Sequence, residues 1–224
     1  MDGYNQNLAN EWIDWVETPD PQGAREKDII PFIKNWLGEL RPEVLCDIGC
    51  GQGIASELID EKTKYIGVDP SQTLLNRARV LYPSINKQFI EGNAHGIPLE
   101  NESVDTVVSI WVWSHLENLN SAASEAFRVL KPKGKFLMVT ANPETHEERK
   151  TFYKHYKIEG NLLTGDFDLG DGKALTGTTL YLHTRDDIER AIKQVGFKIY
   201  NIKRMGQAET SDKGLYLAIE SSKS

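Results

Sequence analysis

Three alternating glycines, Gly49, Gly51 and Gly53, follow an apolar run at residues 44–48. Glycines at this spacing let the backbone turn sharply from a strand into a helix, and they let a ligand approach the main chain closely. Asp69 stands twenty residues after Gly49, at the end of a second apolar run. A carboxylate at the tip of a neighbouring strand can accept hydrogen bonds from both hydroxyl groups of a ribose. Together these residues predict a site for an adenosine-containing cofactor.

The spacing of the loop and the charge before it distinguish between two such cofactors. The dinucleotide fingerprint reads G-x-G-x-x-G, whereas this chain reads G-x-G-x-G and has Ile54 where the last glycine of the fingerprint would stand. Asp47 precedes the turn, and its negative charge would repel a pyrophosphate but suit a cationic amine or sulfonium. The loop therefore favours S-adenosylmethionine over NAD.

The elements that must position these residues alternate between strand and helix, which is typical of a mostly parallel α/β sheet. Apolar runs predict strands at residues 44–48, 65–68, 88–90, 104–110, 135–139, 197–202 and 214–219, the last two as a hairpin. Helical stripes follow Ser71 and Leu119, and Thr184 with Asp187 predicts a capped helix that stops at Gly196. A further, charged helix is predicted over residues 144–157.

Residues 44–138 resemble a class I S-adenosylmethionine-dependent methyltransferase of the small-molecule type. The resemblance rests on four blocks in the family's order, VLCDIGCGQG, YIGVDPS, EGNAHGIPLENESVDTVVSIWVWSHLENL and EAFRVLKPKGKFLMV. It implies a Rossmann-like, seven-stranded, mostly parallel sheet with helices on both faces and an antiparallel last strand. The cofactor would lie at the carboxyl ends of the strands.

The resemblance also implies which residues contact the cofactor. Asp47 and the glycine-loop backbone would lie near the methionine part and Asp69 at the ribose, while Asn93 stands at the adenine where the family often has an acidic residue. The predicted cofactor-binding residues are Asp47, Gly49, Cys50, Gly51, Gly53, Asp69, Pro70, Asn93 and Ala94.

Two segments outside the shared blocks are expected to hold the acceptor. Residues 1–40 carry a helical stripe that includes Trp12 and Trp15, and the glycine-rich stretch at 160–172 predicts a mobile lid or an extended hairpin. We therefore predict one methyltransferase domain over 1–224, composed of an N-terminal helical cap (1–40), a cofactor-binding core (41–140), an acceptor lid (141–183) and a final helix with a strand hairpin (184–224).

The chemistry asks little of the side chains, because a sulfonium methyl group is already electrophilic and the enzyme mainly aligns an O, N or C nucleophile in a dry site. A general base is needed only by some acceptors. His115, after the fourth strand, and His183, which alternates with Tyr181, are the candidate bases. The predicted acceptor-binding residues are Trp12, Trp111, Trp113 and Tyr181. Packing in the core is the alternative role for the tryptophans.

Composition narrows the class of partner. The 224 residues, 39% of them hydrophobic, suit one α/β domain, and the net charge of -7 disfavours a nucleic-acid surface. Neither a signal peptide nor a membrane-spanning run is evident, and Cys46 and Cys50 have no zinc-site spacing, so we expect reduced thiols, no metal and a cytoplasmic location. The end of the fourth strand lacks the Asn/Asp-Pro-Pro-aromatic motif of methyltransferases that act on adenine amino groups or glutamine side chains.

A small-molecule acceptor is therefore expected, with no nucleic acid or membrane as partner. Two other functions stay open from the sequence: an NAD-dependent oxidoreductase, and a module that binds S-adenosylmethionine without catalysis. The acceptor, the methylated atom and the oligomeric state are not specified by these residues.

Overall fold

Seven strands form one twisted sheet in the order β3-β2-β1-β4-β5-β10-β9. The computed structural model describes residues 6–18, 23–170, 172–206 and 213–224. The strands of this sheet are β1 (Val44–Ile48), β2 (Lys64–Asp69), β3 (Lys87–Glu91), β4 (Val104–Ile110), β5 (Leu130–Ala141), β9 (Phe197–Met205) and β10 (Tyr216–Lys223). Strands β1 to β5 pair in parallel, and β10 pairs antiparallel with β5 and β9. The predicted Rossmann-like sheet is confirmed.

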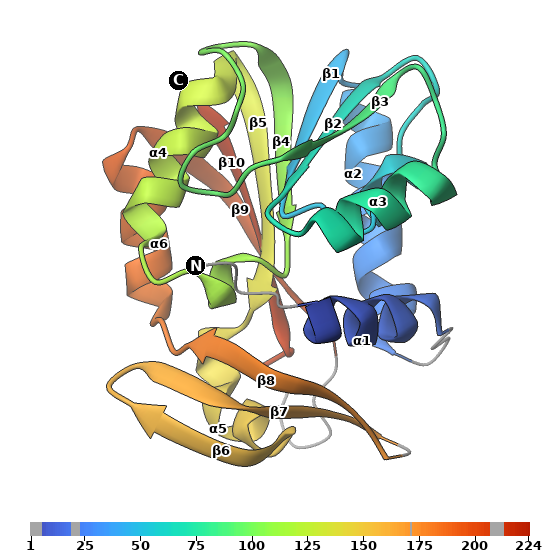
Figure 1. Ribbon diagram of the computed structural model, residues 1–224. Helices are drawn as coiled ribbons and strands as arrows, with labels where there is room; N and C mark the ends of the chain where they lie inside the picture. Colours follow the sequence, from blue (N-terminus) through green and yellow to red (C-terminus); the bar gives the residue numbers. More distant parts are fainter. Residues whose placement is uncertain (1–5, 19–22, 171, 207–212) are drawn as a thin grey trace.

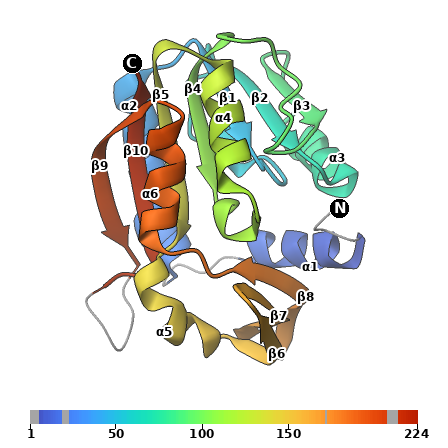
Figure 2. The same ribbon diagram turned by 90° about the vertical axis from the view of Figure 1, so that its left-hand side faces the viewer.

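Helices cover both faces of the sheet (Figure 1), because each face is apolar and must be buried. The helices are α1 (Gln6–Glu17), α2 (Ile30–Leu40), α3 (Gln72–Leu81), α4 (Leu119–Val129), α5 (His146–Lys150) and α6 (Arg185–Gln194). Helices α4 and α6 lie side by side on one face, as Figure 2 shows, and α2 and α3 bury their apolar sides on the other. Four short turns complete the set, a π-helical one at Arg25–Ile29 and 3₁₀ turns at Ile54–Glu57, Trp113–His115 and Pro143–Thr145.

The helix starts predicted from capping residues are confirmed. The Ser71 hydroxyl oxygen accepts a hydrogen bond from the Leu74 N–H at 3.4 Å, at the start of α3. Thr184 and Asp187 form a capping box at the start of α6, in which each side chain accepts a hydrogen bond from the other residue's backbone N–H. These caps fix the start of α3 directly after β2 and the start of α6 a few residues after Tyr181.

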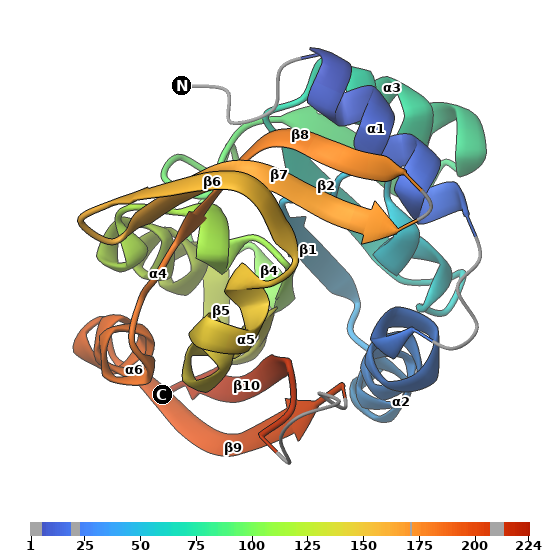
Figure 3. The same ribbon diagram turned by 90° about the horizontal axis from the view of Figure 1, so that it is seen from below.

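A second sheet of three antiparallel strands lies across the carboxyl ends of the parallel strands (Figures 1 and 3). It consists of β6 (Tyr153–Glu159), β7 (Leu162–Gly170) and β8 (Lys173–Tyr181). The extended hairpin predicted around residues 160–172 is thus confirmed. The charged helix predicted over 144–157 is wrong, since α5 ends at Lys150 and β6 follows. The backbone of β6 pairs with β7, and this pairing overrides the helical preference that the spacing of the charges suggested.

Candidate active site

The glycine loop is fixed by close contacts that only glycine allows. Gly49, Gly51 and Gly53 all have positive φ angles, of 72°, 54° and 87°. The Gly49 N–H donates to the Val68 carbonyl at 2.7 Å, which ties the loop to the end of β2. A Cβ atom on Gly49 would lie 2.2 Å from Cγ2 of Val112. The loop therefore holds the carboxyl ends of β1, β2 and β4 together.

Asp69 joins the glycine loop to the neighbouring strand ends. Its carboxylate accepts hydrogen bonds from the N–H of Gly51 at 2.9 Å and of Ser71 at 2.8 Å, and its carbonyl accepts the Gly92 N–H at 3.2 Å. Burial raises the pKa of this carboxyl group, while the two backbone hydrogen bonds counteract the rise. A carboxylate has about four acceptor positions, so it retains capacity for ribose hydroxyls.

Asp47 contains an unsatisfied oxygen. Its side chain is 2% exposed, and Oδ2 accepts a hydrogen bond from the Tyr65 hydroxyl at 2.6 Å. Oδ1 is buried and has no hydrogen-bond partner among the residues that the structure describes. Burial raises the pKa of Asp47 to about 7, opposed by the Tyr65 hydrogen bond and reinforced by the Asp69 charge. Such a carboxyl group needs a cation or a hydrogen-bond donor from a ligand.

A cavity of about 560 Å³ opens beside Asp47 and the glycine loop. Four of the predicted cofactor residues line it, Asp47, Gly49, Cys50 and Gly51, and α1 with the π-helical turn closes it through residues such as Trp12, Val16, Arg25 and Ile29. The other predicted cofactor residues, Gly53, Asp69, Pro70, Asn93 and Ala94, do not line this cavity. Asn93 is exposed, and its side-chain oxygen accepts the His95 N–H at 2.9 Å. The adenine role of Asn93 and Ala94 stays a prediction.

A second, partly open cavity of about 580 Å³ adjoins the first and is bordered on one side by the three-stranded sheet. Trp12 and Trp111 line both cavities, so the two spaces meet at these indoles. The Trp111 ring lies 6.0 Å from Trp15 and 6.1 Å from Tyr216, measured between ring centroids. Trp111 has a φ of 61°, an uncommon conformation for a bulky residue and one that recurs at functional sites. The second cavity therefore has a largely aromatic wall.

His115 lines this second cavity and has a defined tautomer. Its Nδ1 lies 2.5 Å from the Thr179 carbonyl oxygen, so Nδ1 carries the hydrogen and Nε2 carries the lone pair. Burial lowers the pKa of His115, the hydrogen bond to Thr179 opposes this, and the Arg149 charge lowers it further. The imidazole is therefore neutral near pH 7, as a general base must be.

Three other predicted residues lie outside both cavity linings. Trp113 is 1% exposed and packs in the core against Phe136, with ring centroids 5.8 Å apart. Tyr181 and His183 stack on each other at 5.8 Å, and the His183 Nε2–H donates to the Leu116 carbonyl at 2.6 Å. The His183 hydrogen bond connects the segment after β8 to the segment between β4 and α4. The catalytic or acceptor-binding roles of the three residues stay predictions.

Several residues of the second cavity carry no sequence signal of their role. They are Arg149, Tyr153, Phe167 and Tyr216, from α5, β6, β7 and β10. Arg149 falls in a run of charges that resembles a solvated helix face, yet it is 6% exposed. These four side chains come together through tertiary structure, since β10 pairs with β5 and the strands β6 and β7 fold back over the ends of the main sheet.

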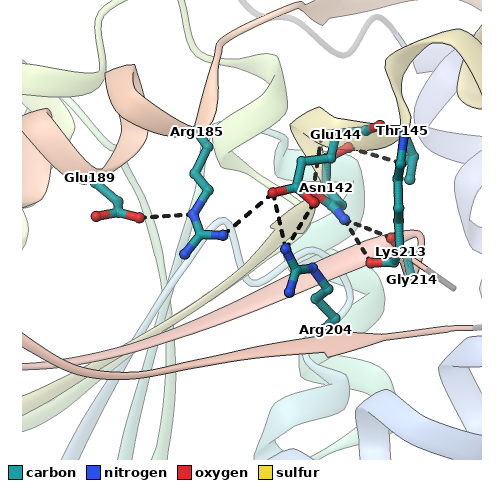
Figure 4. Close-up of polar contacts among 8 residues, drawn as sticks. All are labelled: Asn142, Glu144, Thr145, Arg185, Glu189, Arg204, Lys213 and Gly214. Carbon is teal, nitrogen blue, oxygen red and sulfur yellow. Dashed lines mark hydrogen bonds and ion pairs between the residues drawn. The ribbon is translucent and has the colours of Figure 1, made fainter.

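Polar contacts at the base of the lid hold α5 in place (Figure 4). The buried Asn142 side chain donates to the carbonyl groups of Lys213 and Gly214 at 2.9 and 2.8 Å and accepts the Glu144 N–H at 3.1 Å. Glu144 in turn forms ion pairs with Arg204 of β9 at 2.9 Å and with Arg185 of α6 at 3.4 Å. The lid therefore starts from a fixed junction with the main sheet.

The sheet order and the glycine loop define the class of protein, a Rossmann-like α/β fold with a nucleotide-type site at the carboxyl ends of its strands. Two solved structures share this fold. The PH0226 protein from Pyrococcus horikoshii has a TM-score of 0.69 at 19% identity and covers 95% of this chain and 99% of its own. An S-adenosylmethionine-dependent methyltransferase from Mesorhizobium loti has a TM-score of 0.66 at 18% identity and covers 90% and 99%.

The sequence is also similar to known proteins. Residues 46–138 match the model of the methyltransferase domain. A probable S-adenosylmethionine-dependent methyltransferase of Mycolicibacterium smegmatis is 38% identical over 97 residues, which are 43% of this chain and 37% of that protein. The ubiquinone/menaquinone biosynthesis C-methyltransferase UbiE of Rickettsia prowazekii is 26% identical over 175 residues, covering 72% and 71%. Residues 46–138 are therefore similar to the methyltransferase domain, and the resemblance to class I S-adenosylmethionine-dependent methyltransferases is supported by fold and sequence, while the chain spans little more than a third of the first of these relatives.

The first cavity fits this cofactor. An ionised Asp47 would present its unpartnered oxygen to the sulfonium or amine, and the glycine loop would permit close approach; both roles stay predictions. None of the described helices is long and apolar enough to cross a membrane.

Proposed function

We propose that the protein transfers a methyl group from S-adenosylmethionine to an O, N or C nucleophile of a small-molecule acceptor bound in the second cavity. The observation that carries this proposal is the shared wall of the two cavities at Trp12 and Trp111. A nucleophile in the second cavity would stand next to the cofactor space, and the surrounding aromatic side chains would exclude water.

The cofactor supplies an electrophilic methyl group on sulfur, so the residues of the chain have to bind, orient and deprotonate the acceptor. We propose His115 rather than His183 as the base, for acceptors that must lose a proton. His115 lines the acceptor cavity and has its lone pair on Nε2, whereas His183 lies outside the lining. A carboxylate or a neutral amine needs no such base.

The relatives named as ubiquinone/menaquinone C-methyltransferases favour a cyclic, flat acceptor among the small molecules. A ring of that kind would stack on Trp15, Tyr216 and Phe167 of the second cavity. The two cysteines are buried with unbridged sulfurs, and we keep the prediction of a reducing, cytoplasmic location.

Two measurements test the proposal in sequence. Calorimetric titration with S-adenosylhomocysteine should give a dissociation constant in the micromolar range, about -8 kcal/mol, whereas NAD should not bind. Asp69→Asn should weaken S-adenosylhomocysteine binding roughly tenfold or more, because a ribose hydrogen bond to a charged acceptor contributes about 1.5–3 kcal/mol. Binding of NAD instead would restore the oxidoreductase alternative.

Turnover is then measured with labelled S-adenosylmethionine and a cell extract divided by ultrafiltration. We expect label in compounds of the small-molecule filtrate other than S-adenosylmethionine, once these are separated by chromatography. Label incorporated into the retained protein or nucleic acid would contradict the small-molecule acceptor. Cofactor binding with all label still in S-adenosylmethionine would favour the non-catalytic module.

A further inference from the structure

Arg149 is a buried cation that lacks a counter-charge in the described part of the chain. It is 6% exposed and lines the second cavity. One guanidinium nitrogen donates to the Leu215 carbonyl, and the group lies over the Tyr216 ring at 5.1 Å. Its Nε–H has no acceptor, and no carboxylate pairs with it, among the described residues. Buried charges are normally paired, so the cavity is incomplete without an anion.

Trp111 is a second buried donor in the same cavity. Its indole Nε1–H has no acceptor among the described residues, although its backbone N–H donates to Val139 at 2.7 Å. A buried Trp N–H usually has a hydrogen-bond partner. Arg149 and Trp111 both lie against Tyr216, with the guanidinium carbon 5.1 Å and the Trp111 ring centroid 6.1 Å from the centre of its ring. The aromatic wall thus contains two donors that a ligand's oxygen atoms could satisfy.

On these grounds we propose that the acceptor is a planar aromatic acid whose carboxylate pairs with Arg149 and whose ring packs against the aromatic wall. The inference rests on the proposed function, because it assigns the substrate class of the same cavity. A carboxylate suits a single guanidinium, which can bind it through two parallel hydrogen bonds. A phosphate would call for more positive charge, and Arg149 is the one Lys or Arg in the lining of this cavity among the described residues.

The position of Arg149 makes the carboxylate an anchor. Arg149 lines the second cavity but not the first, whereas Trp12 and Trp111 line both and therefore border the proposed cofactor space. The junction at Asn142 and Glu144 fixes the helix that carries Arg149 (Figure 4), so the guanidinium is preorganised. The atom that receives the methyl group is therefore a different one, oriented toward Trp111 and His115 by the anchored carboxylate.

The test uses the full chain saturated with S-adenosylhomocysteine and titrates matched probes, naphthoate against naphthamide and benzoate against benzamide. Each pair differs in charge and keeps nearly the same shape. We expect the carboxylates to bind roughly tenfold to a hundredfold more tightly than the amides, as a charge-assisted hydrogen bond predicts. Arg149→Gln should abolish this preference, and Arg149→Lys should retain part of it. Arg190→Gln is the control, since that side chain is 59% exposed on α6.

The outcomes separate the two proposals. Equal affinity for acid and amide, a preference that survives Arg149→Gln, or no binding of any probe would each overturn the aromatic-acid proposal. If Arg149→Gln instead weakens the binding of S-adenosylhomocysteine, the guanidinium pairs with the carboxylate of the cofactor, and the inference also fails. Failure of the wild-type chain to bind S-adenosylhomocysteine would overturn the proposed function itself.

Glu209 and Asp212 are acidic residues outside the described part of the chain, so a double variant tests directly whether either one is the counter-ion of Arg149. In the double variant Glu209→Gln, Asp212→Asn the preference for naphthoate over naphthamide should stay unchanged. A gain of tenfold or more in naphthoate affinity would identify an internal counter-ion and overturn the proposal. Thermal unfolding of each variant, followed by circular dichroism, reports whether Arg149→Gln is folded, and Arg149→Lys provides the second readout if it is not.

Discussion

The two cavities that meet at Trp12 and Trp111 are built by different means. The proposed cofactor cavity combines the glycine loop and a carboxylate at the end of β1 with side chains from α1, the π-helical turn, α2 and the 3₁₀ turn at Ile54–Glu57. The proposed acceptor cavity takes its side chains from α1, the turn after β4, the end of β5, α5, the strands of the lid and β10, which are far apart in the sequence. Backbone geometry restricts residue type strongly, whereas an aromatic wall can be composed in many ways. A short sequence motif therefore predicts the first cavity, whereas the second can be identified only from the tertiary structure.

The two regions also differ in how much apolar surface supports them. The main sheet packs between two large apolar clusters, whereas the buried residues of the lid's own cluster are Tyr153, Leu163 and Leu180. Leucines of equal burial occur in both regions, Leu137 in β5 and Leu163 in β7, each 0% exposed. This pair allows the comparison to be measured.

The largest expected effect is on stability from truncation in the main sheet. Leu137→Ala should lower the free energy of unfolding by about 4 kcal/mol, because the surrounding core cannot collapse into the cavity. Leu163→Ala should cost about 2 kcal/mol, since a small cluster can relax around the missing side chain. Urea denaturation followed by circular dichroism measures both values. Equal losses would mean that the lid and the main sheet unfold as one equally packed unit.

A smaller effect follows from changing the glycine loop. Gly49→Ala should destabilise the protein by about 3 kcal/mol, from a positive φ together with the 2.2 Å approach to Val112. It should also abolish S-adenosylhomocysteine binding in calorimetry. Gly160→Ala is the matched control in the lid, with a φ of 62° and open space around its Cβ position, and should cost about 1 kcal/mol. Retained binding in Gly49→Ala would show that the loop adapts.

The third effect is a pH dependence that belongs to the cofactor region. Because burial raises the pKa of Asp47 from 3.8 to about 7, the folded state holds a proton that the unfolded state has released between these values. Stability therefore falls as the pH rises from about 4 to about 7, and the cost is absent below this window and complete above it. The shift corresponds to at most about 4 kcal/mol, and relaxation of the buried site brings the expected cost nearer to 2 kcal/mol.

Asp47→Asn should remove most of this slope, making the variant more stable than the wild type at pH 8 and similar at pH 4, in denaturation measured across pH. Asp69 leaves a residual slope of the same sign, because burial raises its pKa as well. The neighbouring Tyr65, Cys46 and Cys50 stay protonated, since burial raises the pKa of each. The wild type should also prefer S-adenosylmethionine over S-adenosylhomocysteine more strongly at pH 8 than at pH 6. A flat profile in the wild type would contradict the raised pKa.

The same contrast explains what the sequence could predict. The strands, the capping residues Ser71 and Thr184, and the glycine loop follow from local patterns whose physical causes lie within a few residues. The residues 153–159 could not be assigned correctly, because their charges fit a helix and only the pairing with β7 makes them a strand.

Arg149 illustrates the limit for the candidate site. A charge in a run of charges is usually solvated, and its burial depends on the return of β10 and on the junction at Asn142. The position of His183 shows the same dependence, since period-two alternation with Tyr181 predicted a shared face but not which surface that face meets. Tertiary contacts, rather than the local pattern, decide both.

The smallest expected effects come from α1, the helix that touches both regions. On the side of the first cavity, Glu17 forms an ion pair with Arg77 of α3 at 2.6 Å. On the lid side, where α1 runs beside β8 (Figure 3), Glu11 accepts hydrogen bonds from the Thr176 N–H at 2.7 Å and from the Thr176 hydroxyl at 3.0 Å. Exposed pairs contribute little to stability, so neither Glu17→Gln nor Glu11→Gln should shift the unfolding midpoint measurably.

The two variants should nevertheless separate the cavities. Glu17→Gln is expected to weaken the binding of S-adenosylhomocysteine by less than about fivefold. High salt screens the Glu17–Arg77 ion pair, so it should lower the affinity of the wild type toward that of the variant. Glu11→Gln should leave that affinity unchanged and instead speed hydrogen exchange at the β8 amides, because Thr176 loses a charged acceptor. If each substitution altered both readouts, α1 would couple the two regions as one rigid body. Independent responses would mean that the cofactor cavity can be complete while the lid over the acceptor cavity is still opening.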